Sequence, residues 1–433
     1  MMDRLDIRSP KRNKRMQVGW EGFFPYYAGY PEVFANALLR SANLAPEGIV
    51  FDPWNGSGTT TYAASELGMK AVGLDVNPVM VIVARARLLP VSEADSIEPL
   101  AQDIVRTARV RVENVSDQDP LCAWFTAETA AFVRSVERSI AKRLLGRMTL
   151  RAGGANFDSL SGLAATFYVA LFNVCRAMAS SFRTSNPTWI RLPKEEEARI
   201  DVPHRDITER FLTNLQHMVQ ALTTRVAQKG VERGVSELKI ADTTKYALQP
   251  ESVDIVLTSP PYCTRIDYAA ATRIELAVIA PLISGTPDEL SRLMIGSTRV
   301  SKNPIAVSPT WGPRCLKFLD QIRSHPSKAS AGYYYKTHLD YFDKMERSIE
   351  KFTSALKPDG SAIMVVQDSY YKDIHNDLPS ILAEIAAGHG LTLKRREDFY
   401  LRRSMSGINP HTRLYGRSPG AVEAVLCFSK TKN

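Results

Sequence analysis

One strand-turn-helix-strand segment near the start of the chain restricts the fold more than any other feature of the sequence. Residues 49–51 form a short apolar run that ends at Asp52, and the glycine-rich segment 55–61 leads into an alanine-rich helical pattern. Gly68 fits the end of that helix, and residues 71–75 form the next apolar run. Two strands joined through a helix are a βαβ unit, which predicts a parallel sheet covered by helices.

The same α/β rhythm resumes late in the chain, after a long stretch of a different kind. Helical periodicities dominate residues 91–235, and 145 residues are too many for an ordinary connection. We therefore expect a basic N-terminal arm at residues 1–18, a sheet domain made of residues 19–90 and 236–433, and an inserted helical subdomain at residues 91–235. Further strands are predicted at residues 238–240, 253–257, 362–366 and 422–428, helices at 269–283, 338–356 and 378–387, and a mobile loop region at 285–335.

Composition is that of a folded protein with a basic surface. Apolar residues make up 44% of the 433 residues and charged residues 23%, and the net charge of +9 favours a polyanionic partner without requiring one. The five cysteines contain no CxxC pair, so neither a disulfide framework nor a zinc site is indicated. The N-terminal charges precede no apolar stretch, and the longest apolar segment, residues 159–175, is too short and interrupted for a membrane span. We expect a buried helix there and a reducing cytoplasm as the compartment.

The glycine-rich junction carries the first candidate site. Glycines let the backbone approach a ligand closely, and a helix N-terminus offers free N–H groups to a carboxylate or phosphate. Asp75 ends the next strand, where its carboxylate can accept hydrogen bonds from ribose hydroxyls. Dinucleotide enzymes, nucleotide binders and methyltransferases all use such a turn. The pattern is neither GxGxxG nor the GK[ST] of a P-loop, so nicotinamide and ATP are disfavoured.

Two consecutive prolines mark the second candidate site. Pro260 and Pro261 directly follow the strand predicted at residues 253–257 and cannot continue its ladder. They predict a stiff turn at the carboxyl edge of the sheet, where open α/β sheets bind ligands, and this turn brings Ser259 and Tyr262 to the site. On this segment alone, a rigid strand-ending turn with Tyr262 as packing explains the pattern equally well.

Taken together, the two segments resemble the motifs of a known enzyme family. FDPWNGSGTT looks like the cofactor motif, and TSPPY the catalytic motif, of the amino-methyltransferases that modify exocyclic amines of DNA bases. TSPPY is similar to the version common in the N4-cytosine branch, whereas N6-adenine enzymes more often carry DPPY. The resemblance implies an S-adenosylmethionine-dependent enzyme on a Rossmann-like class I methyltransferase sheet of seven strands. It covers the chain outside the insertion, which resembles no recognition domain that we can name.

The resemblance also implies roles for individual residues. Tyr30 and Pro31 match the segment that packs over the methionine end of the cofactor, Asp75 the ribose-binding acid, and Asp242 the acid that faces the adenine amino group. The alternative for Tyr30 is a helix start with buried aromatics, and for Asp242 a helix N-cap. The expected cofactor-binding residues are Tyr30, Pro31, Asp52, Pro53, Asn55, Gly56, Ser57, Gly58, Thr59, Thr60, Asp75, Asn77 and Asp242.

Chemistry at cytosine N4 requires the site to localise a lone pair that is delocalised into the ring. In the N4 interpretation, the Ser259 side chain and the Pro260 carbonyl accept hydrogen bonds from the amino group and favour a pyramidal nitrogen. Tyr262 stacks on the base, which has left the duplex. The expected catalytic residues are Ser259, Pro260, Pro261 and Tyr262, with no metal and no covalent enzyme intermediate.

Double-stranded DNA is the expected partner, and basic segments supply candidate contacts. Six cations against two acids give the first 15 residues a charge of +4, which suggests a phosphate-contacting arm that includes Lys11 and Arg12. A solvated tail is the alternative. Arg183, Trp189 and Arg191 combine cations with an aromatic ring as strand-holding loops do, or else pack the subdomain against the sheet domain. Target recognition is expected in residues 91–235.

Three other functions stay open at this stage. An N6-adenine DNA methyltransferase with an atypical serine is the nearest, and an RNA methyltransferase acting on an amino group is the second. A non-catalytic DNA-binding subunit that keeps the fold is the third, although the intact motifs argue against it. No nuclease motif accompanies the methyltransferase motifs, so a restriction endonuclease or other defence subunit would be a separate chain. No membrane partner is expected.

Overall fold

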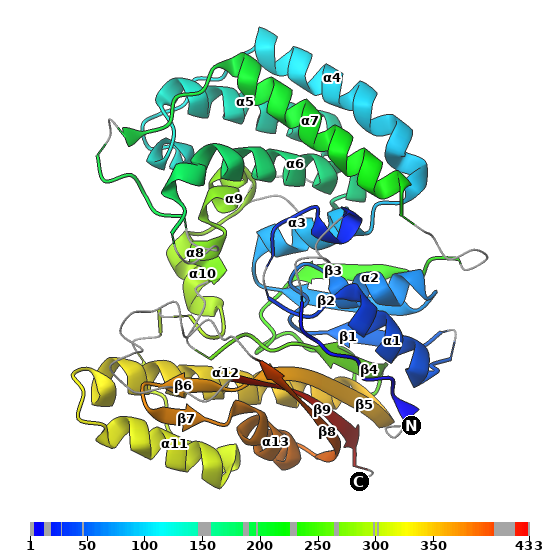
Figure 1. Cartoon of the computed structure of the whole chain (residues 1–433), viewed down its shortest axis with the longest axis vertical. Coiled ribbons are helices and arrows are strands. Elements are labelled where there is room, and N and C mark those ends of the chain that lie inside the picture. Colours follow the sequence, from blue (N-terminus) through cyan, green and yellow to red (C-terminus); the bar gives the residue numbers. More distant parts are fainter. Residues whose placement is uncertain are drawn as a thin grey trace.

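Seven strands form one mostly parallel sheet (Figure 1). The computed structural model describes residues 4–12, 19–26, 28–45, 47–145, 157–184, 190–195, 198–225, 232–263, 268–297, 299–300, 303–401 and 421–431. Strand order is β3-β2-β1-β4-β5-β9-β8, with the first five strands parallel and β9 antiparallel to both of its neighbours. The strands are β1 (Ile49–Asp52), β2 (Lys70–Asp75), β3 (Ser236–Ile240), β4 (Val253–Thr258), β5 (Leu356–Gln367), β8 (Leu391–Leu401) and β9 (Ala421–Lys430). The seven-stranded α/β sheet expected from the sequence is present.

The sequences of the central strands are nearly continuous apolar runs because helices cover both faces of the sheet. Val50 and Ile255 pack against α1 (Glu32–Ala42) and α2 (Thr59–Glu66). Their neighbours Phe51 and Val256 face the opposite side, where they join the apolar cluster of α11 (Gly312–Ser324), α12 (Tyr335–Ala355) and α13 (Leu378–Gly388). Consecutive strand residues alternate between faces, so a strand buried on both faces needs an apolar residue at every position.

A layer of long helices lies between β2 and β3 in the sequence and above the sheet in Figure 1. After α3 (Pro78–Arg87) it comprises α4 (Ala94–Val110), α5 (Ala127–Leu144), α6 (Gly162–Met178) and α7 (His204–Thr223). Among the described residues, the segment Gly162–Phe182 is long and apolar enough to cross a membrane, but 78% of its apolar window is buried inside the protein. It packs on α3, α5, α7 and α9, as the sequence predicts for a buried helix.

Three short helices form a column between this helical layer and the sheet (Figure 1). They are α8 (Tyr268–Ala271), α9 (Arg273–Val278) and α10 (Pro287–Leu293). The continuous helix expected at residues 269–283 is therefore wrong. Thr272 lies between α8 and α9 with a non-helical φ of −116°, and its hydroxyl donates to the carbonyl of Tyr268 at 3.0 Å.

The loop region expected at residues 285–335 is also wrong in part, since it contains α10, α11 and a π-helical turn, η11 (Ser330–Tyr334). Within α11, Cys315, Phe318, Leu319 and Ile322 are buried at helical spacing. Flanking Pro, Ser and Gly residues obscured that period. Two short strands, β6 (Ser369–Tyr371) and β7 (Ile374–Asn376), form a separate hairpin after β5.

Candidate active site

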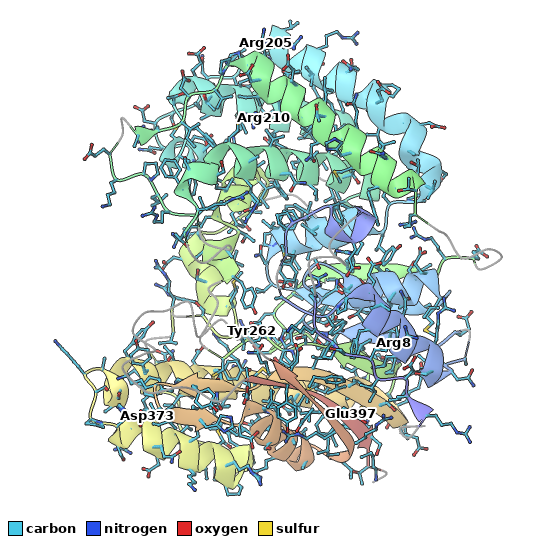
Figure 2. The ribbon with its side chains drawn as sticks, in the orientation of Figure 1. Arg8, Arg205, Arg210, Tyr262, Asp373 and Glu397 are labelled. Carbon is cyan, nitrogen blue, oxygen red and sulfur yellow. The ribbon has the colours of Figure 1, made fainter. Side chains whose placement is uncertain are left out.

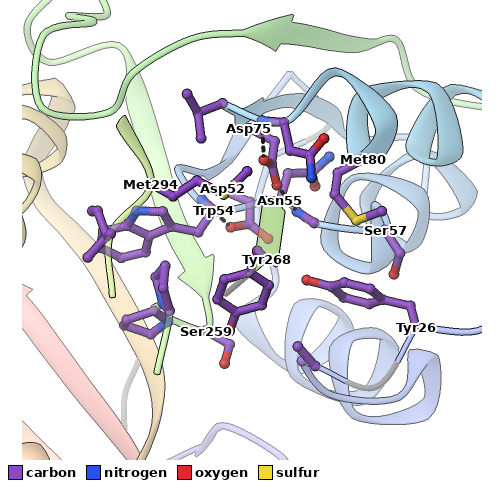
Figure 3. Close-up of a pocket in the computed structure, with 18 of the residues that line it drawn as sticks. Tyr26, Asp52, Trp54, Asn55, Ser57, Asp75, Met80, Ser259, Tyr268 and Met294 are labelled. Carbon is purple, nitrogen blue, oxygen red and sulfur yellow. Dashed lines mark hydrogen bonds between the residues drawn. The ribbon is translucent and has the colours of Figure 1, made fainter. Parts of the chain in front are cut away.

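A cavity of about 130 Å³ lies at the carboxyl ends of β1, β2, β3 and β4 (Figure 3). In the sheet, β2 and β3 lie on one side of β1, and β4 and β5 lie on the other. The cavity therefore sits where the strand order reverses. Its walls come from both candidate segments, which are called here the glycine turn (residues 52–60) and the proline turn (residues 259–262). Two segments about 200 residues apart in the chain thus share one site.

The glycine turn adopts a conformation that only glycine accepts without strain. Gly56 and Gly58 have φ of 49° and 82°. A Cβ added to Gly58 would lie 2.7 Å from the Cβ of Ala84, and one added to Gly56 would lie 2.8 Å from the hydroxyl of Tyr26. The backbone therefore runs tightly between α3 and Tyr26 and places the N-terminus of α2 at the cavity.

Asp75 links the glycine turn to the end of β2. Its Oδ2 accepts the N–H of Gly56 at 3.0 Å, and its Oδ1 accepts the N–H of Asn77 at 2.8 Å. A carboxylate has further lone pairs, and Asp75 lines the cavity. Burial raises the pKa of this carboxyl to about 7, although the two backbone bonds oppose the shift. Asn77 caps α3 through Val79 and donates to Thr272 at 2.9 Å, which fixes α9 beside the cavity.

Asp52 connects the glycine turn to the strand that precedes the proline turn. Its Oδ1 accepts the hydroxyl of Thr258 and its Oδ2 that of Thr60, each at 2.5 Å, and the N–H of Trp54 lies at 3.1 Å. Since the single Thr60 proton goes to Asp52, the Tyr30 hydroxyl donates to Thr60 at 2.6 Å. Burial raises the pKa of Asp52 to about 6. Asp52 is thus a positioning residue at the junction of β1 and β4.

Tyrosine hydroxyls hold the backbone of the proline turn, and one of them, on Tyr268, accepts the N–H of Tyr262 at 3.5 Å. Ser259 and Tyr262 are half-buried and line the cavity, together with Pro260 and Pro261. The hydroxyl of Tyr341 on α12 donates to the carbonyl of Pro261 at 2.9 Å. Figure 2 shows Tyr262 in the middle of the molecule, between the helical layer and the sheet. Pro260 and Pro261 add backbone stiffness to these hydrogen bonds.

Aromatic rings that the sequence analysis did not single out enclose the cavity. Tyr26 and Tyr268 face it from opposite sides in Figure 3, and burial raises the pKa of both phenols, which keeps them neutral. Trp54 also lines the cavity, and its buried indole N–H has no partner among the described residues. The site is therefore largely apolar with a few convergent polar groups, as small-molecule sites usually are.

Two buried arginines at the site were also missed. Arg87 is 1% exposed, and its guanidinium donates to the carbonyl of Ser57 at 2.8 Å and pairs with Glu32. Arg176 reaches the cavity from α6 of the helical layer, where it pairs with Glu275 at 2.6 Å and donates to the carbonyl of Ala271 at 3.1 Å. For Arg176, a lone arginine in the otherwise apolar α6 was the available signal, because burying an unpaired cation is costly.

The structure brings most of the expected site residues together. Those that line the cavity are Tyr30, Asp52, Pro53, Asn55, Gly56, Ser57, Thr59, Thr60, Asp75, Asn77, Asp242, Ser259, Pro260, Pro261 and Tyr262. Pro31 and Gly58 do not line it; the first is the N-cap of α1 and the second that of α2. Asp242 begins no helix and instead accepts both the N–H and the hydroxyl of Thr244 in a turn. Tyr30 both lines the cavity and packs on Phe34, with ring centroids 4.9 Å apart.

Only some of the residues expected to contact DNA are exposed. Arg183 and Arg191 are exposed on the helical layer, where an antiparallel bridge joins Arg183 to Ile190, and Trp189 lies outside the described residues. Lys11 is exposed. The prediction that Arg12 contacts phosphate is wrong. Its side chain is 8% exposed, donates to the carbonyl of Tyr26 at 2.8 Å and lies 3.7 Å from the carboxylate of Glu21. This arginine holds the segment before the cavity and is not presented to solvent.

Comparisons with known proteins point to DNA methylation. Residues 5–85, which include the glycine turn and Asp75 but not the proline turn, match the family model described as DNA methylase. The chain is 22% identical to the type II methyltransferase M.MvaI of Kocuria varians over 362 residues, which are 78% of this chain and 73% of that protein. It is 35% identical to the type II methyltransferase M.SmaI of Serratia marcescens over 89 residues, or 19% of this chain and 30% of that protein. The similarity therefore includes the DNA methylase segment of this chain and covers most of the length of one type II methyltransferase.

Proposed function

We propose that this protein is a DNA methyltransferase that transfers a methyl group from S-adenosylmethionine to the exocyclic N4 amino group of cytosine. The observation that carries the proposal is the meeting of the glycine turn, Asp75 and the proline turn at one cavity. A cofactor cradle and a base-binding turn must share a site for direct transfer between them. The names of the type II relatives support DNA as the substrate.

The cavity suits the proposed cofactor. Asp75 offers lone pairs to a ribose diol, the start of α2 offers N–H groups to a carboxylate, and the glycine turn leaves room that any Cβ would take. The Tyr26 ring provides an aromatic face of the kind that attracts a sulfonium cation. When bound, the cofactor supplies an electrophilic methyl group.

The proline turn supplies the acceptors that the target nitrogen needs. The Ser259 hydroxyl and the Pro260 carbonyl accept the two N–H bonds of the base amino group, so the nitrogen lone pair points toward the methyl group. Tyr262 stacks on the extruded base. A carbon–nitrogen bond then forms as the carbon–sulfur bond breaks, and one amino proton leaves to water. Ser259 is the residue that favours the N4 product, since the N6-adenine enzymes that these motifs resemble more often carry an aspartate at this position.

Product analysis separates this function from its alternatives. Purified protein is incubated with labelled S-adenosylmethionine and unmethylated genomic DNA, and the digested nucleosides are separated. Label in N4-methylcytosine is the expected result. Label in N6-methyladenine would keep the cofactor site and overturn the role of Ser259. Label in RNA alone would reassign the substrate, and failure to bind the cofactor would favour a non-catalytic DNA-binding subunit.

We also propose a division of labour around this site. The helical layer at residues 91–235, with Arg183 and Arg191 exposed, recognises the target sequence, while residues 19–90 and 236–433 carry out the transfer in the cytoplasm. In a restriction-modification or phage-defence setting the endonuclease is a separate chain. Sequencing of the methylated DNA would reveal a defined site, and loss of that site with retained transfer in an Arg183→Gln, Arg191→Gln variant would support this division.

A further inference from the structure

An exposed aromatic and cationic surface lies on the sheet domain outside the cavity. It consists of η11, the start of α12 and the β6–β7 hairpin, and it is called here the tyrosine surface. Tyr333 is 44% and Tyr334 37% exposed, although tyrosine rings usually pack. The ammonium group of Lys372 lies 5.9 Å from the ring centre of Tyr334, and the guanidinium of Arg323 lies 6.0 Å from that of Tyr335.

The backbone of this surface is constrained in ways that ordinary packing does not require. η11 is a π-helix, a form that is rare and often functional. Ala329 and Lys372 have φ of 70° and 55°, which are costly for residues with a Cβ. Buried bonds maintain the arrangement: the hydroxyls of Ser330 and Tyr371 lie 2.5 Å apart, and His338 bonds the carbonyl of Tyr334 at 2.7 Å. The interior of the domain thus holds the exposed rings in place.

Positive charge prevails on the tyrosine surface. Arg323, Lys328 and Lys336 are exposed and Lys372 is half-buried. Two of the nearby carboxylates bond histidines, Asp373 with His325 at 3.0 Å and Asp368 with His375 at 2.9 Å, and Asp320 is exposed on α11. Exposed aromatic rings interleaved with cations match single nucleic-acid strands, since bases stack on the rings and phosphates pair with the cations.

The position of the surface relates it to the proline turn. The β6–β7 hairpin follows the carboxyl end of β5, which is the neighbour of β4, and the proline turn follows β4. On α12, Tyr341 bonds Pro261 and lies seven residues beyond Tyr334, about 10 Å along the helix axis. Figure 1 shows the hairpin and α12 together at the lower left, and Figure 2 labels Asp373 there beyond Tyr262.

We propose that the tyrosine surface binds the DNA strand that flanks the extruded base. Tyr333 and Tyr334 stack on bases that lose their neighbours when the target leaves the duplex, and Lys328 and Lys336 pair with the adjoining phosphates. This inference rests on the proposed function, because it requires a base to be taken out of DNA. It adds a contact surface on the sheet domain, opposite the helical layer.

The test measures DNA binding by the full chain, using a labelled duplex with one mismatched cytosine, which lowers the cost of extrusion. Tyr333→Ala with Tyr334→Ala should raise the Kd roughly tenfold or more, as loss of base stacking does. Tyr333→Phe with Tyr334→Phe keeps the rings and should bind like the wild type. Lys328→Gln with Lys336→Gln should lower the slope of log Kd against log salt by about 1 to 2. Lys70→Gln is the control for loss of a surface charge elsewhere, because Lys70 is 52% exposed at the amino end of β2, where it pairs with Glu47.

The outcomes separate this inference from the proposed function. Wild-type protein that neither binds nor methylates DNA would overturn the proposed function itself. Wild-type protein that methylates DNA, with alanine and glutamine variants whose Kd and salt slope equal those of Lys70→Gln, would overturn the tyrosine surface alone. Cofactor affinity is measured for every variant, and an unchanged value shows that the cavity is intact.

Discussion

The glycine turn and the proline turn face the same cavity, but the structure holds them by different means. The glycine turn is bonded by Asp75 and Arg87 and, through its own Asp52, by Thr258. The proline turn has the Tyr341 bond to Pro261, a bond from the N–H of Tyr262 to the Tyr268 hydroxyl at 3.5 Å and the intrinsic stiffness of its prolines. Charged side chains of β2 and α3 thus hold one wall, while tyrosine hydroxyls and stiff prolines hold the other.

The Ser259→Ala substitution should distinguish the roles of the two turns most clearly. Loss of one acceptor at the reacting amine should lower the methylation rate by about 10² to 10³-fold, whereas cofactor affinity should stay at the wild-type value, since the glycine turn is untouched. Single-turnover transfer and calorimetric titration measure the two quantities. Ser354→Ala, at an exposed position of α12, is the control. A near-normal rate would remove Ser259 from the mechanism.

Gly58→Ala breaks the glycine turn. The new Cβ meets Ala84 at 2.7 Å and the backbone is left-handed there, so we expect the free energy of unfolding to fall by about 2 to 4 kcal/mol and cofactor binding to be lost. Denaturant unfolding measures the first effect. Gly388→Ala, where the nearest atom is 3.5 Å away, should be nearly neutral. Equal stability of the two variants would contradict the tight fit.

Asp75→Asn tests the polar side of the glycine turn. Cofactor affinity should fall by about 1 to 3 kcal/mol, the cost of charged hydrogen bonds left unmade. In the wild-type protein, affinity should also decline as the pH falls below about 7, because the Asp75 carboxyl then takes up a proton and loses acceptor capacity. This decline should disappear in Asp75→Asn.

The stability of the cofactor-free protein should follow pH in the opposite direction. Asp52 and Asp75 have folded-state pKa values of about 6 and about 7, above the ordinary 3.8, so the folded protein binds their protons more tightly. The contribution of these two carboxyls to the free energy of unfolding should therefore fall as the pH rises from about 4 to 7. The difference between the wild type and an Asp52→Asn, Asp75→Asn variant isolates it from the opposite contribution of His338, whose pKa burial lowers to about 4. Parallel trends in affinity and stability would show that Asp75 does not contact the cofactor.

Tyr341→Phe loosens the proline turn and should have the smallest effect. Removal of one hydrogen bond to the carbonyl of Pro261 costs about 1 kcal/mol and should slow methylation several-fold, with cofactor affinity unchanged. Steady-state kinetics with saturating cofactor would measure it. If this variant lost cofactor binding instead, the two turns would not be independent.

The sequence was sufficient to predict features whose cause is local. The glycine turn and the proline stop are each encoded in fewer than ten consecutive residues, the βαβ unit lies within residues 49–75, and the strands predicted for the centre of the sheet are present. β8 was missed because it is an edge strand: its charged residues pair along the strand, Arg395 with Glu397 and Arg396 with Asp398, and the pattern resembles a solvated face.

Features that depend on distant partners could not be predicted from the sequence. Arg12 belongs to a charged tail by composition, yet its partners are carbonyls and an acid that follow it by 9 to 16 residues. Arg176 becomes part of the cavity only because Glu275, 99 residues later, draws it there. Such pairings are tertiary, and no local pattern encodes them.

The helix α9 ties the helical layer to the rest of the protein. Arg134 of α5 donates to the carbonyls of Ala277 and Val278, and Arg176 of α6 pairs with Glu275, so two guanidinium groups of the helical layer hold a part of the sheet domain. Without these helices, the carboxylate of Glu275 and the carbonyls of Ala271 and Val278 would lose these cationic partners. The sheet domain therefore depends on the helical layer to satisfy polar groups that lie beside its own cavity.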